Sequence, residues 1–269
     1  MVPLELDPVQ YLSATTVDTF LLWNIRGVGN RSSIRHLRQL IKDHKSSFVM
    51  ISEPMIHQDR IIRVGNSLSL TNFAHNSGYG GKIWILWGDS YSVTVLSSSS
   101  QFIHTKITYN PVGTVFFATF IYASCDCLER RILWSDLSAI GSRIGCPWIM
   151  GGDFNVVSNL TERLGGRLAL NQSIEDFNEF IDNNELVDGG FIGSKYMWCN
   201  NQQGYRRIWA RLDRVLINST WVRLFPKISV QHQARLLGPL AFGRSSSQSH
   251  QTRSLSVQVS AYVGYPRLL

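Results

Sequence analysis

The stretch Trp148-Ile149-Met150-Gly151-Gly152-Asp153-Phe154-Asn155 decides the fold of this chain. Its apolar start, ended by two glycines, is typical of a buried strand. The chain then presents Asp153 and Asn155, a carboxylate and an amide that are costly to bury without partners. Polar side chains at the mouth of a core strand indicate a functional site at that edge of the sheet.

Other predicted strands end in the same way. One apolar run, residues 20–23, is followed by Asn24, and another, residues 48–52, is followed by Glu53. A third run ends in Tyr122. If these strands share sheets, their ends converge on one mouth that holds two carboxylates, two amides and a phenol.

The rest of the chain mixes strands and helices without strict alternation, which favours an α+β layered sandwich. Residues 82–122 are rich in β-branched and aromatic residues between turn residues, as in an antiparallel meander. The remaining elements follow from periodicity and composition: helices over residues 32–41, 128–144 and 172–183, and short strands over 196–199, 213–217 and 228–231.

We expect one large domain over residues 20–242, after an N-terminal extension (1–19) and before an irregular, basic, Ser-rich tail (243–269). The first residues lack a basic region followed by an apolar core, and no run of about 18 apolar residues exists, which argues against secretion and a membrane span. Four cysteines without zinc-site spacing favour reduced thiols in an intracellular protein. No obligate protein partner is indicated.

The net charge of +7 is distributed unevenly. Residues 1–200 hold 16 Lys or Arg and 18 Asp or Glu, whereas residues 201–269 hold 10 Lys or Arg and one acid, Asp213. A basic end beside a nearly neutral body fits a polyanion partner such as nucleic acid. It fits a solvated basic tail with no partner equally well, so charge alone leaves both interpretations open.

The polar strand ends suit metal-assisted phosphodiester hydrolysis. Glu53 and Asn24 offer the oxygen ligands that a hard cation such as Mg²⁺ prefers, and that cation offsets charge on the phosphate. Asp153 is suited to orient or deprotonate a water. Asn155 and Tyr122 are suited to hydrogen-bond phosphate oxygens. Each residue alone also has a structural explanation, but the five together fit one reaction better.

Six segments carry a resemblance to a known family. They are LLWNIRGVG (21–29), ISEP (51–54), FIYAS (120–124), MGGDFN (150–155), WCNN (198–201) and IWARLDRVLIN (208–218). They resemble the endonuclease/exonuclease/phosphatase superfamily, and in detail the endonuclease domain of plant LINE-type non-LTR retrotransposons. The resemblance covers about residues 20–242. It implies the four-layer α/β/β/α sandwich of the deoxyribonuclease I-like type, acting on DNA with Mg²⁺ or, alternatively, Mn²⁺.

The resemblance also implies a role for each catalytic position. Asn24 and Glu53 would bind the metal, and Tyr122 would contact the scissile phosphate. Asp153 would position the nucleophilic water with support from Asn155. The family orients a histidine with the aspartate that aligns with Asp213.

Four further positions would meet DNA according to the resemblance. Trp198 lies where the family often has a Thr-Trp pair, although the preceding residue here is Met197. Arg206, Arg207 and Arg211 would face the phosphate backbone, in agreement with the basic C-terminal third.

The family pattern breaks near the end of the resemblance. The family closes with Ser-Asp-His, and here that triplet would fall between Leu237 and Gly238, where it is absent. His250 lies 37 residues beyond Asp213 in a Ser-rich stretch. His232 lies too early and is expected to face outward from a strand. Neither histidine is a good replacement.

These losses predict weak or absent catalysis. Removing a group that stabilises transition-state charge costs about 10²–10³ in rate, and removing a general acid or base costs roughly 10²–10⁴. We therefore expect a DNA endonuclease fold whose activity is weak or lost. The alternatives are a non-catalytic nucleic-acid-binding relic and, less favoured, a small phosphoesterase. Nuclear placement would rest on family analogy alone.

Overall fold

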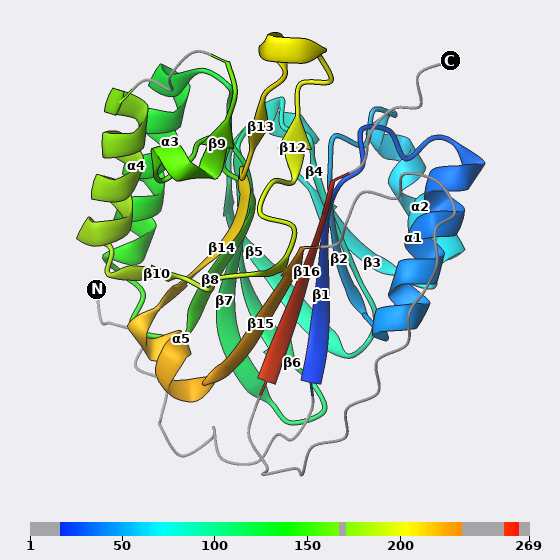
Figure 1. Cartoon of the computed structure of the whole chain (residues 1–269). Coiled ribbons are helices and arrows are strands. Elements are labelled where there is room, and N and C mark those ends of the chain that lie inside the picture. The colour runs from blue at the N-terminus through cyan, green and yellow to red at the C-terminus, as the bar shows by residue number, and fades with distance from the viewer. Residues whose placement is uncertain (1–16, 167–170, 233–255, 264–269) are drawn as a thin grey trace, which may run out of the picture.

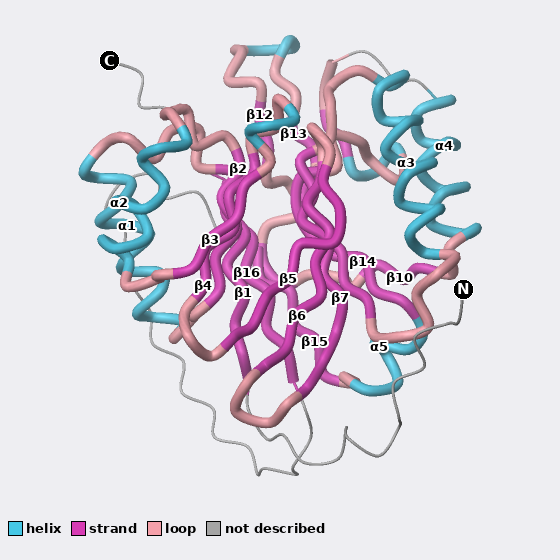
Figure 2. Tube along the Cα trace, turned by 180° about the vertical axis from the view of Figure 1, so that it is seen from behind, coloured by secondary structure: helices cyan, strands magenta, loops and turns pink. Residues whose placement is uncertain are grey.

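The computed structural model describes residues 17–166, 171–232 and 256–263 (Figure 1). Two β-sheets lie face to face at the centre, with a pair of helices outside each sheet (Figures 1 and 2). This is the predicted four-layer α/β/β/α sandwich. The helices of the two outer layers are α1 (Arg31–His44) with α2 (Ile61–Leu68), and α3 (Cys127–Gly141) with α4 (Asn171–Asn183).

The first sheet has seven strands, and its centre brings together distant parts of the chain. The order is β11 (Ile192–Gly193), β15 (Lys227–His232), β16 (Ser256–Val263), β1 (Val17–Asn24), β2 (Phe48–Ser52), β4 (Ile83–Trp87) and β3 (Asn72–His75). Strand β16 lies between β1 and β15 and is parallel to both. The tail predicted to be irregular over residues 243–269 therefore contains one strand, and its other residues lie outside the described ranges.

The second sheet has six strands, of which β7 and β8 form a parallel pair. The order is β10 (Leu186–Asp188), β14 (Asp213–Asn218), β8 (Trp148–Asp153), β7 (Thr114–Tyr122), β6 (Phe102–Tyr109) and β5 (Tyr91–Ser98). A small third sheet consists of β12 (Trp198–Cys199), β13 (Trp209–Ala210) and β9 (Arg163–Leu164). The short helices are η2 (Gln58–Arg60), η3 (Ser77–Tyr79), η4 (Leu160–Glu162), η5 (Gly204–Arg206) and α5 (Ser219–Leu224).

The predicted meander over residues 82–122 is divided between the two sheets. Strand β4 pairs with β2 and β3 in the first sheet, whereas β5, β6 and β7 form an antiparallel run in the second. The turn at Gly88 passes the chain from one sheet to the other, and Gly88 N donates to the carbonyl oxygen of Ser47, which immediately precedes β2. Turn residues in the sequence do not indicate whether the next strand pairs with the previous one or joins the other sheet.

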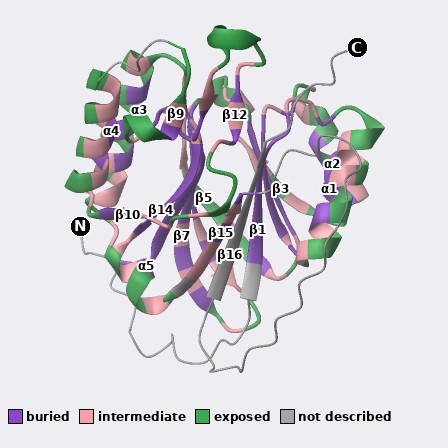
Figure 3. Cartoon of the chain, in the orientation of Figure 1, coloured by how far each residue is buried: buried purple, intermediate pink, exposed green. Residues whose placement is uncertain are grey.

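Three apolar cores hold the layers together, one between the sheets and one under each helical layer. Between the sheets, the rings of Phe48 and Phe120 stack with centroids 5.2 Å apart. Strands β2 and β8 are buried throughout, as expected for strands covered on both faces (Figure 3). The fully buried central strands therefore deliver their polar ends to the rim of the sandwich.

Candidate active site

The predicted site residues come together at one end of the two sheets. Asn24 ends β1 opposite Ser52, which ends β2 immediately before Glu53. In the second sheet, Asp153 ends β8 level with Tyr122 of β7 and with Asp213 at the start of β14. Because β14 is antiparallel to β8, its first residue lies at the same end as the last residue of β8.

A hydrogen bond between Asn24 and Asp153 joins the two sheets at this end. Asn24 Nδ2 donates to Asp153 Oδ2 over 3.3 Å, and both side chains are buried. Asn24 Oδ1 is also buried, and no hydrogen-bond donor in the described part of the chain reaches it. An orphaned carbonyl oxygen beside a carboxylate suits a bound cation.

Glu53 is held by Tyr122 and Arg26 from opposite sheets. Tyr122 Oη donates to Glu53 Oε1 over 2.5 Å. Arg26 Nε lies 3.7 Å from Glu53 Oε2 and has no hydrogen bond of its own, although it is buried. Three backbone hydrogen bonds fix this arrangement, because the N–H groups of Ile25, Gly27 and Val28 donate to the carbonyl oxygens of residues 52, 53 and 54 in turn.

The Asp-Phe-Asn sequence divides its side chains between core and site. Phe154 is fully buried and its ring packs against that of Trp134, with centroids 6.2 Å apart. Asp153 Oδ1 accepts from Asn155 N over 2.9 Å. Asn155 Nδ2 donates to Ala123 O over 2.6 Å, which ties the loop after β8 to the end of β7. The apolar middle residue thus anchors the two polar ones.

Unusual backbone angles cluster at the site. Arg26, Glu53 and Asn155 all have positive φ, at 45°, 51° and 49°, and none of them is a glycine. Gly152 has φ +139°, and a Cβ there would lie 2.0 Å from Ile121 O. Such conformations are costly and concentrate at functional sites. The strain indicates that the position of these side chains matters more than the local stability of the backbone.

The site concentrates negative charge in a buried place. Burial raises the pKa of Asp153 to about 6, and the charge of Glu53 adds to the rise, while hydrogen bonds from Asn155 and Asn24 oppose it. Burial, followed by the charge of Asp153, raises the pKa of Asp213 well above its ordinary value. Burial and the hydrogen bond to Glu53 likewise raise the pKa of Tyr122.

Arg26 is the site residue that sequence reasoning missed. Its charge lowers the pKa of both Asp153 and Asp213, besides pairing with Glu53. It stands two residues after Asn24 in the same motif, Trp23-Asn24-Ile25-Arg26-Gly27, which was the available signal. Its strained φ, visible only in the structure, marks it as a positioned side chain rather than a surface cation.

Asp213 does not receive the expected histidine from the described residues. His232 is buried, not outward-facing as predicted, because its ring stacks on that of Phe191 with centroids 4.6 Å apart. Its Nδ1 lies 3.0 Å from Ser194 O. Burial, as the largest effect, lowers the pKa of His232. His250 lies outside the described residues.

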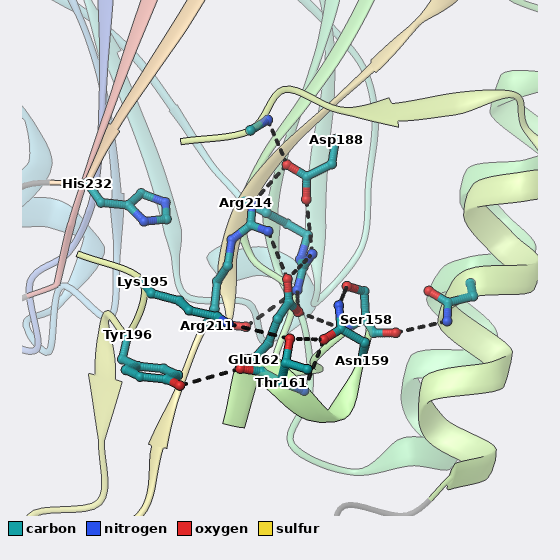
Figure 4. A network of polar contacts seen from close by, with 12 residues as sticks. Ser158, Asn159, Thr161, Glu162, Asp188, Lys195, Tyr196, Arg211, Arg214 and His232 are labelled. Carbon is teal, nitrogen blue, oxygen red and sulfur yellow. Dashed lines mark hydrogen bonds and ion pairs between the residues drawn. The ribbon is translucent and has the colours of Figure 1, made fainter. Parts of the chain in front are cut away.

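Arg211 is buried, which corrects the expectation that it faces a phosphate backbone. Its guanidinium lies 2.8 Å from both Glu162 Oε1 and Asp188 Oδ1, and Arg214 pairs with the same two carboxylates (Figure 4). Arg211 and Arg214 flank Asp213 in the chain. We call these four residues the Glu162 network, and it fixes the start of β14 rather than offering charge to a ligand.

The other predicted DNA contacts lie on the β12–β13 hairpin, which protrudes beside the site (Figure 1). Trp198 is half-buried at its base, whereas Arg206 and Arg207 are exposed at its tip. Tyr205, the residue directly before Arg206, is 84% exposed. The structure therefore places Arg206 and Arg207, but not Arg211, where a ligand can reach them.

The donor set fits a hard cation. Asn24 Oδ1 and the Glu53 carboxylate are oxygen ligands of the kind that Mg²⁺ takes, and the Asn24 oxygen lacks any other partner among the described residues. The described residues contain no group of three or more His, Cys, Asp or Glu placed to share one metal.

Solved structures with the same fold include several nucleic-acid enzymes. The endonuclease domain of TRAS1, a telomere-specific non-LTR retrotransposon, has a TM-score of 0.51 at 13% identity, covering 74% of this chain and 84% of that one. The AP endonuclease LMAP from Leishmania major has a TM-score of 0.54 at 14% identity, covering 75% and 79%. D. rerio TDP2, complexed with single-strand DNA product, has a TM-score of 0.50 at 13% identity, covering 74% and 83%.

A search among curated proteins found no match to this chain. No helix in the described ranges is long and apolar enough to cross a membrane. The model of the endonuclease/exonuclease/phosphatase family matches residues 21–241, which span all the site residues placed above. The chain therefore belongs to the endonuclease/exonuclease/phosphatase family.

Proposed function

We propose that this chain is a Mg²⁺-dependent DNA endonuclease of the retrotransposon type, with low activity. The observation that carries the proposal is the Asn24–Asp153 pair at the junction of the sheets, with Asn24 Oδ1 left free to face a cation. Glu53 and Tyr122 complete the wall beside it. Two solved structures of the same fold are the endonuclease domain of a retrotransposon and an enzyme complexed with single-strand DNA product, and two exposed arginines lie on the adjacent hairpin of this chain.

Asn24 and Glu53 would hold Mg²⁺, with Mn²⁺ as a substitute. When bound, the metal offsets the charge that builds on the phosphate in the transition state. Asp153, with its pKa raised to about 6, is ionised near neutral pH yet basic enough to take a proton from a water. The backbone bond from Asn155 N holds Oδ1 of Asp153, so the carboxylate is already oriented. Tyr122 Oη steadies Glu53 and lies beside the space for the phosphate.

We expect low activity because Asp213 lacks the histidine partner that the family places beside this aspartate. The family's histidine is absent at its usual place in the sequence, and the buried His232 bonds to Ser194 instead. Burial and the charge of Asp153 favour the protonated form of Asp213, so it adds little charge of its own. Without the imidazolium, we expect a rate about 10²–10³ below that of a complete site.

The test is nicking of supercoiled plasmid by purified protein in Mg²⁺, Mn²⁺ or EDTA. Metal-dependent nicking is expected in wild type, and it should disappear in Asp153→Ala and Glu53→Gln. Asp136→Asn on α3, a carboxylate outside the site, is the matched control and should nick like wild type. Nicking that survives in Asp153→Ala would show a contaminating nuclease and contradict the proposal.

One observation favours a second candidate, a non-catalytic nucleic-acid-binding protein. The Ser-Asp-His triplet is missing from the sequence after Leu237, while the exposed Arg206 and Arg207 remain. In that case the protein binds DNA, but neither wild type nor any variant nicks the plasmid in Mg²⁺ or Mn²⁺. Single-turnover nicking with enzyme in excess separates a slow enzyme from this alternative, because it detects one cut per molecule over hours.

A further inference from the structure

Helix α1 carries a row of exposed cations that the candidate site does not use. We call Arg31, Arg35, Arg38, Lys42 and Lys45 the basic stripe, and all five are exposed. The first four lie within α1, and their spacing of four, three and four residues places them on one face, opposite the buried Leu37 and Leu40. Lys45 is the residue that caps the C-terminal end of the helix. Among the described residues, no carboxylate forms an ion pair with any of the five.

The two helical layers of the sandwich carry opposite charge. Helices α1 and α2 hold five Lys or Arg and one Asp, a balance of +4. Helices α3 and α4, on the opposite side of the molecule, hold two Arg and six Asp or Glu, a balance of −4 (Figure 1). The basic stripe is therefore a local property of one outer layer, and not a reflection of the chain's overall charge.

Helix stability does not explain the stripe. Arg31 opens the helix, where the macrodipole disfavours a cation, and the first turn contains no acid. Arg31 with Arg35, and Arg38 with Lys42, are like-charged pairs four residues apart, which destabilise a helix. Asp43, the acid in α1, accepts instead from Gln39 Nε2 over 2.7 Å. Lys42, in the last turn, is favoured by the macrodipole, but Arg31 and the two like-charged pairs are not. A ligand outside the helix is the better explanation for these.

We propose that the basic stripe binds the phosphate backbone of duplex DNA beyond the cleaved bond. The stripe starts at Arg31, seven residues after Asn24 in the chain, so a short loop joins the site to the first cation of the stripe. The fourteen residues of α1 span about 21 Å, which is the length of roughly six base pairs along the axis of a DNA duplex. The inference rests on the proposed action on DNA only for the identity of the polyanion.

The geometry also predicts a direction for the duplex. Beyond the site, DNA is drawn over α1 and α2 and repelled from α3 and α4. Arg38 donates from Nε and Nη2 to Ser67 O of α2, at 3.0 and 2.7 Å, which fixes one stripe cation between the helices. Arg60 and Arg63, both exposed at the start of α2, add two cations to the same helical layer.

The test compares two double variants of equal charge. Arg35→Glu with Lys42→Glu reverses two stripe positions, and Arg143→Glu with Arg223→Glu reverses two exposed cations elsewhere. Each lowers the net charge by four. The stripe variant should fold like wild type, because each new Glu has a cation three or four residues away on α1, which offsets the unfavourable placement of one Glu in the last turn. Its melting temperature should therefore lie close to that of wild type.

Binding to a fluorescent 30-base-pair duplex in EDTA is measured by anisotropy over a range of salt concentrations. For the stripe variant we expect affinity to fall roughly tenfold or more at 0.1 M salt, with a salt slope shallower by about 2. The control variant should lose much less. Equal losses in the two variants, or no binding by wild type, would overturn the inference.

Two further measurements separate the outcomes. Vesicles containing phosphatidylserine test the other anionic surface, and a stripe variant that loses vesicle binding while keeping DNA affinity would overturn the DNA assignment. Plasmid nicking by the same proteins tests the proposed function. If DNA binding depends on the stripe and no protein nicks the plasmid, the stripe proposal stands and the endonuclease proposal is refuted. If wild type nicks the plasmid and both double variants bind DNA equally, the endonuclease proposal stands and the stripe proposal is refuted.

Discussion

Asn24 and Asp153 are 129 positions apart in the chain, yet the amide of one donates to the carboxylate of the other over 3.3 Å. Each ends a central strand, one in each sheet. The bond therefore reports how the two sheets are aligned at the site. Any change that shifts one sheet against the other alters the space between the metal ligands and the proposed base.

Asp153→Asn should abolish nicking and stabilise the fold at alkaline pH. The folded-state pKa is raised to about 6 from an ordinary 3.8, so ionisation costs folding free energy as pH rises through that window. At pH 8 the variant should be more stable by roughly 1–3 kcal/mol, and at pH 4 nearly unchanged. The Asn24 amide can turn so that its free Oδ1 accepts from the new Asn. Urea unfolding at both pH values measures the difference, and equal stability at pH 8 would contradict it.

Mg²⁺ should raise the melting temperature through Asn24 and Glu53. A ligand that binds only the folded state stabilises it by RT ln(1 + [L]/Kd), about 2.7 kcal/mol at 100 times Kd. Asn24→Ala and Glu53→Gln should each remove the rise. Glu175→Gln, an exposed carboxylate on α4, is the control and should keep it. A rise that persists in both site variants would place the metal elsewhere.

Gly152→Ala should destabilise the fold strongly. A Cβ at this position would lie 2.0 Å from Ile121 O, a backbone atom that cannot move without breaking β7–β8 pairing, and φ is +139°. We expect a loss of about 2–4 kcal/mol. Gly190 also has positive φ, but nothing lies within 4 Å of its Cβ position. Gly190→Ala should therefore cost only about 1 kcal/mol by urea unfolding, and equal losses would show that strain alone decides.

Glu162→Gln should destabilise far more than loss of an exposed pair. It leaves Arg211 and Arg214 buried with a single carboxylate, at a cost of about 3–5 kcal/mol. Asp176→Asn, which breaks the pair with the half-exposed Arg131, should cost only about 0.2–1 kcal/mol. Urea unfolding at pH 7 compares the two, and similar values would contradict the role of the network.

The same network predicts an acid limit. Burial would raise the pKa of Glu162, but the charge and hydrogen bond of Arg214 outweigh it and lower the pKa to about 2. Its contribution to stability is complete above the ordinary value of 4.5 and disappears as pH falls toward 2. Unfolding measured at pH 5 and pH 2.5 should show the wild type losing more stability than Glu162→Gln.

The fold could be predicted from the sequence, and so could the convergence of Asn24, Glu53, Tyr122 and Asp153. Polar residues directly after apolar runs are a pattern that the sequence itself shows. The sequence did not indicate which of the nearby arginines is buried. Arg206, Arg207 and Arg211 lie close together in the sequence, but only Arg211 pairs with carboxylates, those of the buried Glu162 and the partly exposed Asp188. Long-range partners of this kind leave no local pattern.

Strand β16 was hidden by composition. The Ser-rich surroundings of residues 256–263 favoured an irregular tail, yet Val257, Val259, Ala261 and Val263 alternate with polar or aromatic neighbours. That alternation was the signal for a strand. It was outweighed because pairing with β1, more than 200 residues earlier, is a tertiary effect.

The position of β16 also sets the order in which the molecule can assemble. It fills the gap between β1 and β15, and its pairing joins Val17 to Ser256. Until residues 256–263 leave the ribosome, β1 and β15 each present an open edge to other chains. Contacts of such long sequence separation form slowly, so the first sheet is completed last. A nascent chain would therefore leave the edge of β1 open to other chains from the synthesis of residue 24 until that of residue 256.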